Sequence, residues 1–523
     1  MGLERMWSYM KKRMHRAAAL ALCLILALSA APAALAAGTP LARTADYVCQ
    51  TVTDPTVGTA GGEWAMLALK RAGRLTADQE ARYLENLQKY LEASGGVLSS
   101  TKYTEYARVT LALTALGEDP GNAAGYDLLS PLAECDKVVR QGINGAIWAL
   151  IALRSAACTA WDVQDGKLVE AGDVYRSAIL SAQLPDGGWS LSGKTPADPD
   201  ITAMALCALA PDQENDAVKA AVERGLGCLS AIQNADGTFG APAAESCAQV
   251  VLALHELGLS PDDARFTKGG VSALEALLTF ARSDGSFSHV PGGMADQMAT
   301  EQALCALAAQ EVEGSFFLPE TTGETPDLAI PALGSETVTF PDIQGRADQS
   351  AIEDLARRGV LLGRSDGTFD PDASMTRGEF CAVVVRALGL KKTQESPFTD
   401  VPAWCADAVA AAYEAGIVRG TTATTFTPGG TITRQEAAVM LARAARYASG
   451  TAVSYSQAAC EALLRSGGSD WAQCGAWAAR DVALCLQSGL LGGTDGTIRP
   501  RSPITRGEVA QSVAGLLRSA FLA

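Results

Sequence analysis

Histidine is scarce in this sequence, and the scarcity limits the chemistry that the chain can perform. The 523 residues include three histidines, of which only His255 and His289 lie beyond residue 36. Neither is flanked by a serine, cysteine or aspartate pattern that would predict a catalytic triad. A hydrolase or lyase that depends on histidine is therefore not indicated.

The sequence also lacks the closely spaced cysteine pairs of redox and metal-binding motifs. None of its 13 cysteines forms a Cys-x-x-Cys motif. Cysteine within an apolar helical pattern behaves as a small core residue, so free buried thiols are favoured, while disulfides stay open for a secreted chain. The cysteines in such patterns are Cys207, Cys247, Cys305, Cys381 and Cys485.

Basic residues are fewer than acidic ones, with 42 Lys and Arg and 58 Asp and Glu, and the net charge is −16. The first 36 residues carry five cations and one glutamate, so the rest of the chain has a net charge of −20. An acidic surface repels polyanions, and we expect neither nucleic acid nor anionic lipid as a partner.

Only one long apolar run occurs, and it lies at the N-terminus. Basic residues precede the run at 17–30, and Ala34-Leu35-Ala36 then supplies the small residues of a signal peptidase site. The run is too short for a membrane span, and no second run follows it. We interpret residues 1–36 as a cleaved signal peptide and expect a secreted protein with no transmembrane anchor.

Residues 37–317 predict an all-α domain, because strand-like alternation is nearly absent. Stretches that are apolar on all sides alternate with stretches that have one charged face, as expected for buried and outer helices. We count about twelve helices, or six hairpins, and expect an α6/α6 toroid. Five of the stretches predicted to be buried are 106–116, 145–153, 201–209, 248–257 and 300–308.

Several loops of this domain combine an Asp-Gly turn with an aromatic residue that can pack onto the neighbouring helices. Examples are Asp186-Gly187-Gly188-Trp189, Asp236-Gly237-Thr238-Phe239 and Asp284-Gly285-Ser286-Phe287. The pattern resembles the QW-type repeat of the terpenoid cyclase and prenyltransferase superfamily, whose domains are α/α toroids. The resemblance covers nearly all of 37–317 and implies the fold but not an activity.

Cyclase activity, as implied by this resemblance, would depend on one aspartate. Cyclases of this kind protonate their substrate from the middle Asp of a DxDDTA motif. Here Asp198-Pro199-Asp200-Ile201-Thr202-Ala203 retains two of the three acids, which makes Asp200 the only catalytic candidate. The alternative is that Asp200 caps the helix that follows it. Aromatics, at 6% of the chain, are few for steadying a carbocation.

The other activities of toroids depend on zinc or on a pocket. A prenyltransferase-like zinc site would need Glu245-Ser246-Cys247 with a histidine, but Cys247 is favoured as a core residue, so we expect no metal and no cofactor. Carriage of a cobalamin- or isoprenoid-like ligand needs only polar groups at the barrel mouth. The candidates by position are Asp198, Asp200, Glu245, Asp296 and Gln297.

A linker rich in proline and threonine at 318–339 precedes three copies of one pattern, predicted at 340–392, 393–450 and 451–523. Each copy contains two glycines, a turn and a Thr-Arg-x-Glu box. The boxes begin at Thr376, Thr433 and Thr505 and predict capping boxes, in which Thr and Glu satisfy backbone amides. Capping does not explain the arginine that every copy retains.

These copies resemble S-layer homology repeats, which form a pseudo-threefold helical bundle with grooves between the repeats. In that family the grooves bind secondary cell wall polysaccharide, often pyruvylated, and the motif arginine engages the anionic group. Trp404 and Trp477 match the family's tryptophan, whereas the first repeat has Ala347 in its place, which puts the first groove in question. The resemblance implies that the polysaccharide is bound by Arg377, Arg434, Arg506, Trp404, Trp477, Gly363, Gly420 and Gly493.

The sequence therefore predicts a cell-surface protein that is anchored non-covalently to the bacterial wall and displays a toroid. Binding and display without catalysis is the favoured function. A surface enzyme or a small-ligand carrier that uses the toroid cavity is the alternative.

Overall fold

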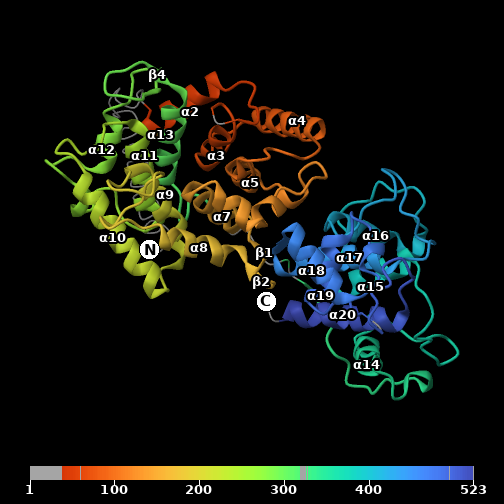
Figure 1. Cartoon of the computed structure of the whole chain (residues 1–523). Helices are drawn as coiled ribbons and strands as arrows, with labels where there is room; N and C mark the ends of the chain where they lie inside the picture. The colour runs from red at the N-terminus through yellow and green to blue at the C-terminus, as the bar shows by residue number, and fades with distance from the viewer. Residues whose placement is uncertain (1–37, 59, 319–325, 327, 494, 522–523) are drawn as a thin grey trace, which may run out of the picture.

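The structure is a computed structural model that describes residues 38–521 except 59, 319–325, 327 and 494. The predicted signal peptide lies outside the described residues. Two helical bodies are visible in Figure 1, one formed by the first part of the chain and one by the last part.

The first body is a closed ring of six inner helices wrapped by six outer ones. Each inner helix packs against the next, and the last packs against the first. The inner helices are α3 (Glu63–Arg71), α5 (Tyr103–Leu116), α7 (Ile143–Ser155), α9 (Pro199–Leu209), α11 (Ala244–Glu256) and α13 (Gln297–Ala309). The outer helices are α2 (Pro40–Thr51), α4 (Ala77–Ser94), α6 (Cys135–Arg140), α8 (Ala171–Ser181), α10 (Asp216–Ile232) and α12 (Ala273–Leu278).

The burial of these helices follows their sequence patterns and confirms the predicted α6/α6 toroid. Inner helix α7 buries every residue from Gly145 to Leu153, whereas outer helix α4 buries one stripe that includes Tyr83, Leu87 and Leu91. The aromatic loop residues pack as expected. The Trp189 ring is fully buried, and its Nε1 donates a hydrogen bond to the Ile179 carbonyl at 2.7 Å.

The second body contains two helices from each repeat, arranged around a pseudo-threefold axis. They are α14 (Gln349–Arg357) and α15 (Arg377–Leu388), α16 (Ala403–Glu414) and α17 (Arg434–Ser449), and α19 (Ala479–Gln487) and α20 (Arg506–Phe521). Packing crosses between repeats, with α16 against α15, α19 against α17 and α14 against α20. At the axis, one residue of each repeat donates its amide to the backbone carbonyl of the next. Met375 donates to Ile504, Ile504 donates to Ile432, and Ile432 donates to Met375, with N···O distances of 3.1–3.2 Å. This closed cycle of hydrogen bonds confirms the predicted pseudo-threefold bundle.

A small sheet joins the two bodies; we did not predict it, although Asp165-Gly166 between two of its strands is a hairpin signal. Strand β1 (Cys158–Gln164) pairs antiparallel with β2 (Lys167–Glu170) in the toroid and parallel with β5 (Ala452–Tyr455) from the third repeat. Strand β5 and helix α18 (Gln457–Gly467) form an insertion of the third repeat. In the toroid, β3 (Phe287–Ser288) pairs with β4 (Ala295–Asp296). The all-α prediction is therefore correct in outline and missed these short strands.

All twelve cysteines of the described residues are free, in agreement with the favoured interpretation. Burial raises the pKa of the Cys247 thiol to about 12, as expected for a core residue.

Candidate functional site

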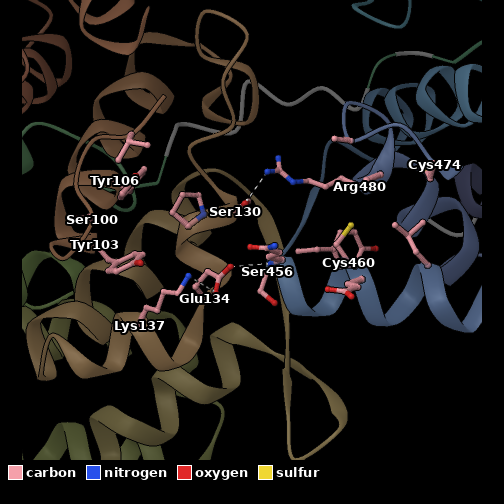
Figure 2. A pocket seen from close by; sticks show the side chains of 18 of the residues that line it. Ser100, Tyr103, Tyr106, Ser130, Glu134, Lys137, Ser456, Cys460, Cys474 and Arg480 are labelled. Carbon is pink, nitrogen blue, oxygen red and sulfur yellow. Dashed lines mark hydrogen bonds and ion pairs between the residues drawn. The ribbon is translucent and has the colours of Figure 1, made fainter. Parts of the chain in front are cut away.

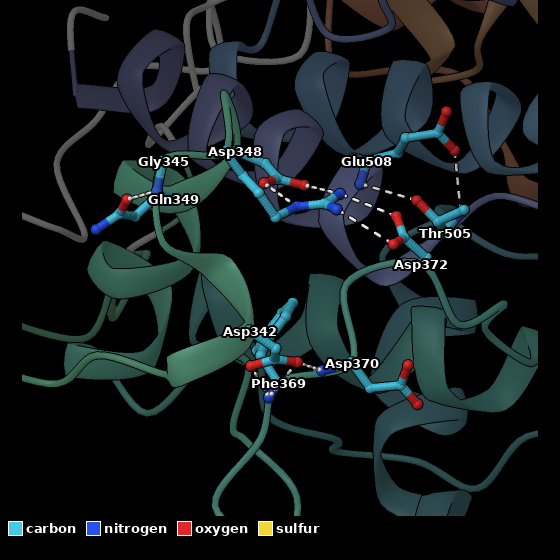
Figure 3. Close-up of polar contacts among 10 residues, drawn as sticks. Asp342, Gly345, Asp348, Gln349, Phe369, Asp370, Asp372, Thr505 and Glu508 are labelled. Carbon is cyan, nitrogen blue, oxygen red and sulfur yellow. Dashed lines mark hydrogen bonds and ion pairs between the residues drawn. The ribbon is translucent and has the colours of Figure 1, made fainter.

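In each repeat of the bundle, one aspartate binds two backbone amides of the loop that precedes the second helix. Asp342 accepts hydrogen bonds from the amides of Phe369 and Asp370, as Figure 3 shows. Asp400 and Asp470 do the same in the second and third repeats. The second residue of each loop pair has a left-handed backbone, with φ of 61°, 60° and 53° at Asp370, Thr427 and Arg499. The three loops are thus fixed in one shape.

The predicted capping boxes form in all three repeats. In the first, the Thr376 hydroxyl accepts from the Glu379 amide, while a Glu379 oxygen accepts from the Thr376 amide at 2.8 Å. The same exchange occurs between Thr433 and Glu436, and between Thr505 and Glu508. Each box places its arginine at the first residue of the helix.

The three arginines reach from one repeat into the next around the bundle. Arg377 Nη2 donates to the Arg419 carbonyl at 2.8 Å, and Arg506 Nη2 donates to the Leu362 carbonyl at 2.8 Å. Arg434 Nη2 donates to the Gly492 carbonyl in the same way. Each acceptor directly precedes one of the three predicted glycines, so the arginine of one repeat and the glycine of its neighbour form one groove.

These glycines allow a close approach of chain segments. A β-carbon at Gly363 would collide with the Phe340 ring, one at Gly420 with the Thr422 carbonyl, and one at Gly493 with the Gly467 carbonyl. Any side chain at these positions would displace the loop that carries the carbonyl acceptor. The glycines therefore shape the grooves.

The grooves differ in the exposure of their arginine. Arg434 is 1% exposed, donates to the Ile498 carbonyl and forms an ion pair with Glu508 at 2.6 Å. It lines a cavity of about 390 Å³ together with Gly492 and Gly493. Arg377 is half-buried, and its guanidinium lies 4.7 Å from the centre of the Phe426 ring. Its Nε has no partner among the described residues.

Two grooves carry an exposed indole. The side chains of Trp404 and Trp477 are 60% and 63% exposed. The Trp404 ring lies against Gly378, next to Arg377. Trp477 contacts Gly475, whose amide donates to the Gln435 side chain next to Arg434. A flat exposed ring beside a guanidinium can hold the apolar face of a sugar while the guanidinium holds an acidic substituent.

The third groove carries a carboxylate where the indole would be. Asp348 lies against Gly507, next to Arg506, and its neighbour Ala347 replaces the tryptophan. Arg346 bridges Asp348 and Asp372, with contacts of 2.9 Å to each (Figure 3). Ala347 itself lines the cavity of Arg434, Gly492 and Gly493.

The toroid has a separate cavity of about 290 Å³ near the start of its inner helices. Trp64 and Trp148 line it, with ring centres 5.0 Å apart. Gln249 and Asn144 also line it, and their side-chain oxygens have no hydrogen-bond partner among the described residues. Buried acceptors without donors favour a bound molecule that donates hydrogen bonds.

A buried charge network borders this cavity. Arg108 donates to Glu63 at 2.6 Å and also pairs with Glu105, while the Tyr83 hydroxyl donates to Glu63 at 3.1 Å. Burial raises the pKa of the Glu63 carboxyl, and the Arg108 charge opposes this effect. We did not predict this network, although charged residues within otherwise apolar helices were a signal for it.

Asp200 does not cap its helix, and none of the five predicted mouth residues lines the cavity. The cap of α9 is Asp198, which accepts from the Asp200 and Ile201 amides at 2.9 and 3.1 Å. Burial raises the pKa of the Asp200 carboxyl. Glu245 pairs with His289 at 2.9 Å, and Asp296 caps α13. Of the five residues, Asp198 and Asp296 satisfy backbone amides at helix starts, as expected for short polar side chains in these positions.

Comparison with known proteins assigns the C-terminal repeats. The S-layer homology domain model matches residues 339–381, 397–438 and 469–510, so the chain contains three S-layer homology domains. An endoglucanase of Bacillus sp. (strain KSM-635) is 32% identical over 219 residues, which are 42% of this chain and 22% of that protein. The surface-layer 125 kDa protein of Lysinibacillus sphaericus is 34% identical over 139 residues, which are 26% of this chain and 12% of that protein.

The chain thus spans less than a quarter of these relatives. The domains and the surface-layer relatives indicate association with the cell surface. Among solved structures, the chain is similar to Candida albicans protein geranylgeranyltransferase-I (12% identity, TM-score 0.36, 52% of this chain and 91% of that one). It is also similar to ent-copalyl diphosphate synthase from Streptomyces platensis (20% identity, TM-score 0.32, 48% of this chain and 50% of that one). Within the described residues, every helix is too short or too polar to cross a membrane.

Proposed function

We propose that the three S-layer homology domains hold this protein on secondary cell wall polysaccharide through the grooves between repeats, and that the toroid is displayed from the wall. The observation that carries this proposal is an exposed indole close to the helix start that carries the arginine. Trp404 lies against Gly378, next to Arg377, and Trp477 contacts Gly475, whose amide binds Gln435, next to Arg434. A guanidinium fork suits a carboxylate, such as that of a pyruvate ketal, and an indole suits a sugar ring.

The grooves contribute unequally in this proposal. Among the described residues Arg377 forms no ion pair and its Nε has no hydrogen-bond partner, so it is the arginine best placed for an anionic ligand. Arg434 is already neutralised by Glu508 and mainly shapes its groove. Linked weak sites on one polymer give an avidity that exceeds each single affinity.

Co-sedimentation of the full chain with purified wall material tests the proposal. Trp404→Ala combined with Trp477→Ala should weaken sedimentation at least tenfold without changing the melting temperature, because both rings are exposed. Leu191→Ala is the matched control, since Leu191 is 66% exposed on the toroid. Undiminished sedimentation of the double variant would overturn the assignment.

We propose a second function for the toroid, namely binding of a small molecule that donates hydrogen bonds within the 290 Å³ cavity. The unpartnered oxygens of Gln249 and Asn144 beside two tryptophans favour this function. Native mass spectrometry of the full chain after exposure to culture extract should reveal an added mass. Gln249→Leu should abolish that mass. If the added mass persists in this variant, or if no added mass is found for the wild type, the cavity is excluded as the binding site.

A further inference from the structure

A third cavity, larger than the other two, lies between the toroid and the third repeat, and we call it the cleft. It has a volume of about 870 Å³, within the range of roughly 300–1,000 Å³ that is usual for ligand pockets. Figure 2 shows its two walls, one carrying Tyr103, Glu134 and Lys137 and the other carrying Ser456 and Cys460. None of the groove arginines or tryptophans lines this cleft.

The walls of the cleft are held together by specific contacts. Strand β5 pairs with β1, and Ser456 at its end donates to the buried Asp162 of the toroid. The Gln457 amide donates to Glu134 at 3.0 Å. Arg480 donates to the Ser130 hydroxyl at 2.9 Å and pairs with Asp127. The cleft is therefore a fixed feature of the folded chain.

One wall comes from the insertion that distinguishes the third repeat. The motif arginines recur after 57 residues between Arg377 and Arg434, but after 72 residues between Arg434 and Arg506. The added length forms β5 and α18, and the short helix η7 (Trp471–Gln473) follows. These segments face the toroid and contribute Tyr455, Glu461 and Trp471 to the cleft.

The charges that line the cleft are compensated within the protein. Glu134 pairs with Lys137 at 3.1 Å, Glu461 pairs with Arg465, and Arg480 pairs with Asp127. A charged ligand would have to compete with these ion pairs. In contrast to the groove of Arg377, the cleft is suited to an uncharged molecule.

The remaining lining combines aromatic rings on both sides with hydroxyl groups on the toroid side. Trp471 lines the repeat side, and the edges of Tyr103 and Tyr106, which stack with ring centres 6.0 Å apart and are 9% and 4% exposed, line the toroid side. Hydroxyls are supplied by Ser99, Ser100 and Ser130 from the toroid. Rings that pack on C–H faces, together with hydroxyls that exchange hydrogen bonds, match the chemistry of a sugar chain.

We propose that this cleft binds an uncharged oligosaccharide. The site goes beyond the proposed wall anchoring, because it uses neither the grooves nor an acidic substituent. A neutral sugar chain has two sources at a cell surface: a stretch of wall glycan, or an external plant-type glucan or xylan. Both present the same hydroxyl and C–H surfaces to the cleft.

Calorimetric titration of the full chain distinguishes these sources, with neutral oligosaccharides cut from purified wall, cellohexaose and xylohexaose as probes. We expect at least one probe to bind. Trp471→Ala removes a ring from one wall, and Ser100→Trp fills the cleft from the other, so each should weaken binding at least tenfold. Ser283→Trp, at an exposed position outside the cleft, is the matched control for the second variant and should bind normally.

Wall sedimentation of the same variants separates this site from the grooves. Trp471→Ala and Ser100→Trp should sediment normally, whereas Trp404→Ala with Trp477→Ala should lose sedimentation but still bind the oligosaccharide. Binding of the wall probe alone assigns the wall as the source, and binding of a hexaose alone assigns an external glycan. The inference is overturned if no probe binds, or if binding survives in both cleft variants.

Discussion

The carboxylate of Asp348 lies against Gly507 at the start of α20, in the position where the Trp404 ring lies against Gly378 at the start of α15. Pseudo-threefold symmetry relates the two positions. One groove thus presents an indole beside its arginine, and the other has no indole and a carboxylate that is already bound by Arg346. We expect the groove of Arg506 to be the weakest of the three.

This difference can be tested by giving the weak groove the missing indole. Ala347→Trp combined with Asp348→Asn should increase affinity for pyruvylated wall polysaccharide several-fold, because a third groove then adds to the avidity. Ala347 is exposed, so the new ring should not disturb the core. Binding of immobilised polysaccharide is the measurement. Asp372→Asn, which removes the other carboxylate bound to Arg346, is the control and should leave affinity unchanged. Unchanged affinity of the double variant would show that this groove does not bind.

Arg434 and Arg377 should differ in their contribution to stability. Arg434→Ala removes a buried guanidinium that binds two carbonyls and leaves Glu508 with one fewer cation, which should cost about 3 kcal/mol of unfolding free energy. Arg377→Ala removes one hydrogen bond at a half-buried position and should cost about 1 kcal/mol. Urea denaturation measures both values.

Wall binding should depend more on Arg377 than on Arg434, which is the opposite of the order expected for stability. Arg377→Ala should reduce sedimentation with wall material while the chain stays folded. Arg434→Lys should retain most of the sedimentation of the wild type. Equal losses of stability in the two alanine variants would contradict the division of roles proposed for them.

Local sequence signals predicted the parts of the fold that depend on neighbouring residues. The Thr376–Glu379 capping box, the Trp189 loop and the buried stretch at 145–153 each follow from residues a few positions apart. The helix starts were therefore predicted closely, although α9 is capped by Asp198 and not by Asp200.

Contacts between distant segments could not be predicted in this way. The pairing of β1 with β5 joins segments almost 300 residues apart, and neither shows a strong alternating pattern. The hydrogen-bond partners of Arg377 and Arg506 are backbone carbonyls, which leave no side-chain signal in the sequence. Only the motif's position at a helix start could be derived, and the ligand roles of its residues remain proposals.

Glu301 should make the stability of the toroid depend on pH. Burial raises the pKa of its carboxyl to about 7, while the Gln297 side chain and the Gly61 amide donate to one oxygen at 2.7 Å. The unfolded pKa is about 4.3, so between pH 4.3 and 7 the folded chain binds a proton that the unfolded chain has released. The free energy of unfolding therefore falls as pH rises through this window, by roughly 4 kcal/mol for this group.

Glu301→Gln tests this dependence, because glutamine keeps the accepting oxygen without the charge. Its unfolding free energy should be higher than that of the wild type at pH 7.5 and similar at pH 4.5. Denaturation at several pH values measures the difference, with Glu85→Gln, an exposed glutamate of α4, as the control. Parallel pH profiles of Glu301→Gln and the wild type would rule out this origin of the dependence.

The ion pairs between the two bodies should determine whether the toroid and the bundle unfold together. Arg446 pairs with Asp119, and Arg480 pairs with Asp127, so both cations of the bundle contact acids of the toroid. Arg446→Ala with Arg480→Ala leaves those acids uncompensated and should weaken the docking that β1 and β5 provide. Scanning calorimetry should then resolve two transitions where the wild type shows one, and small-angle scattering should give a larger radius of gyration.

Arg465→Ala, which breaks an ion pair within α18, is the control and should keep one transition. A single transition in the double variant would mean that the parallel strand pair is sufficient to hold the two bodies together.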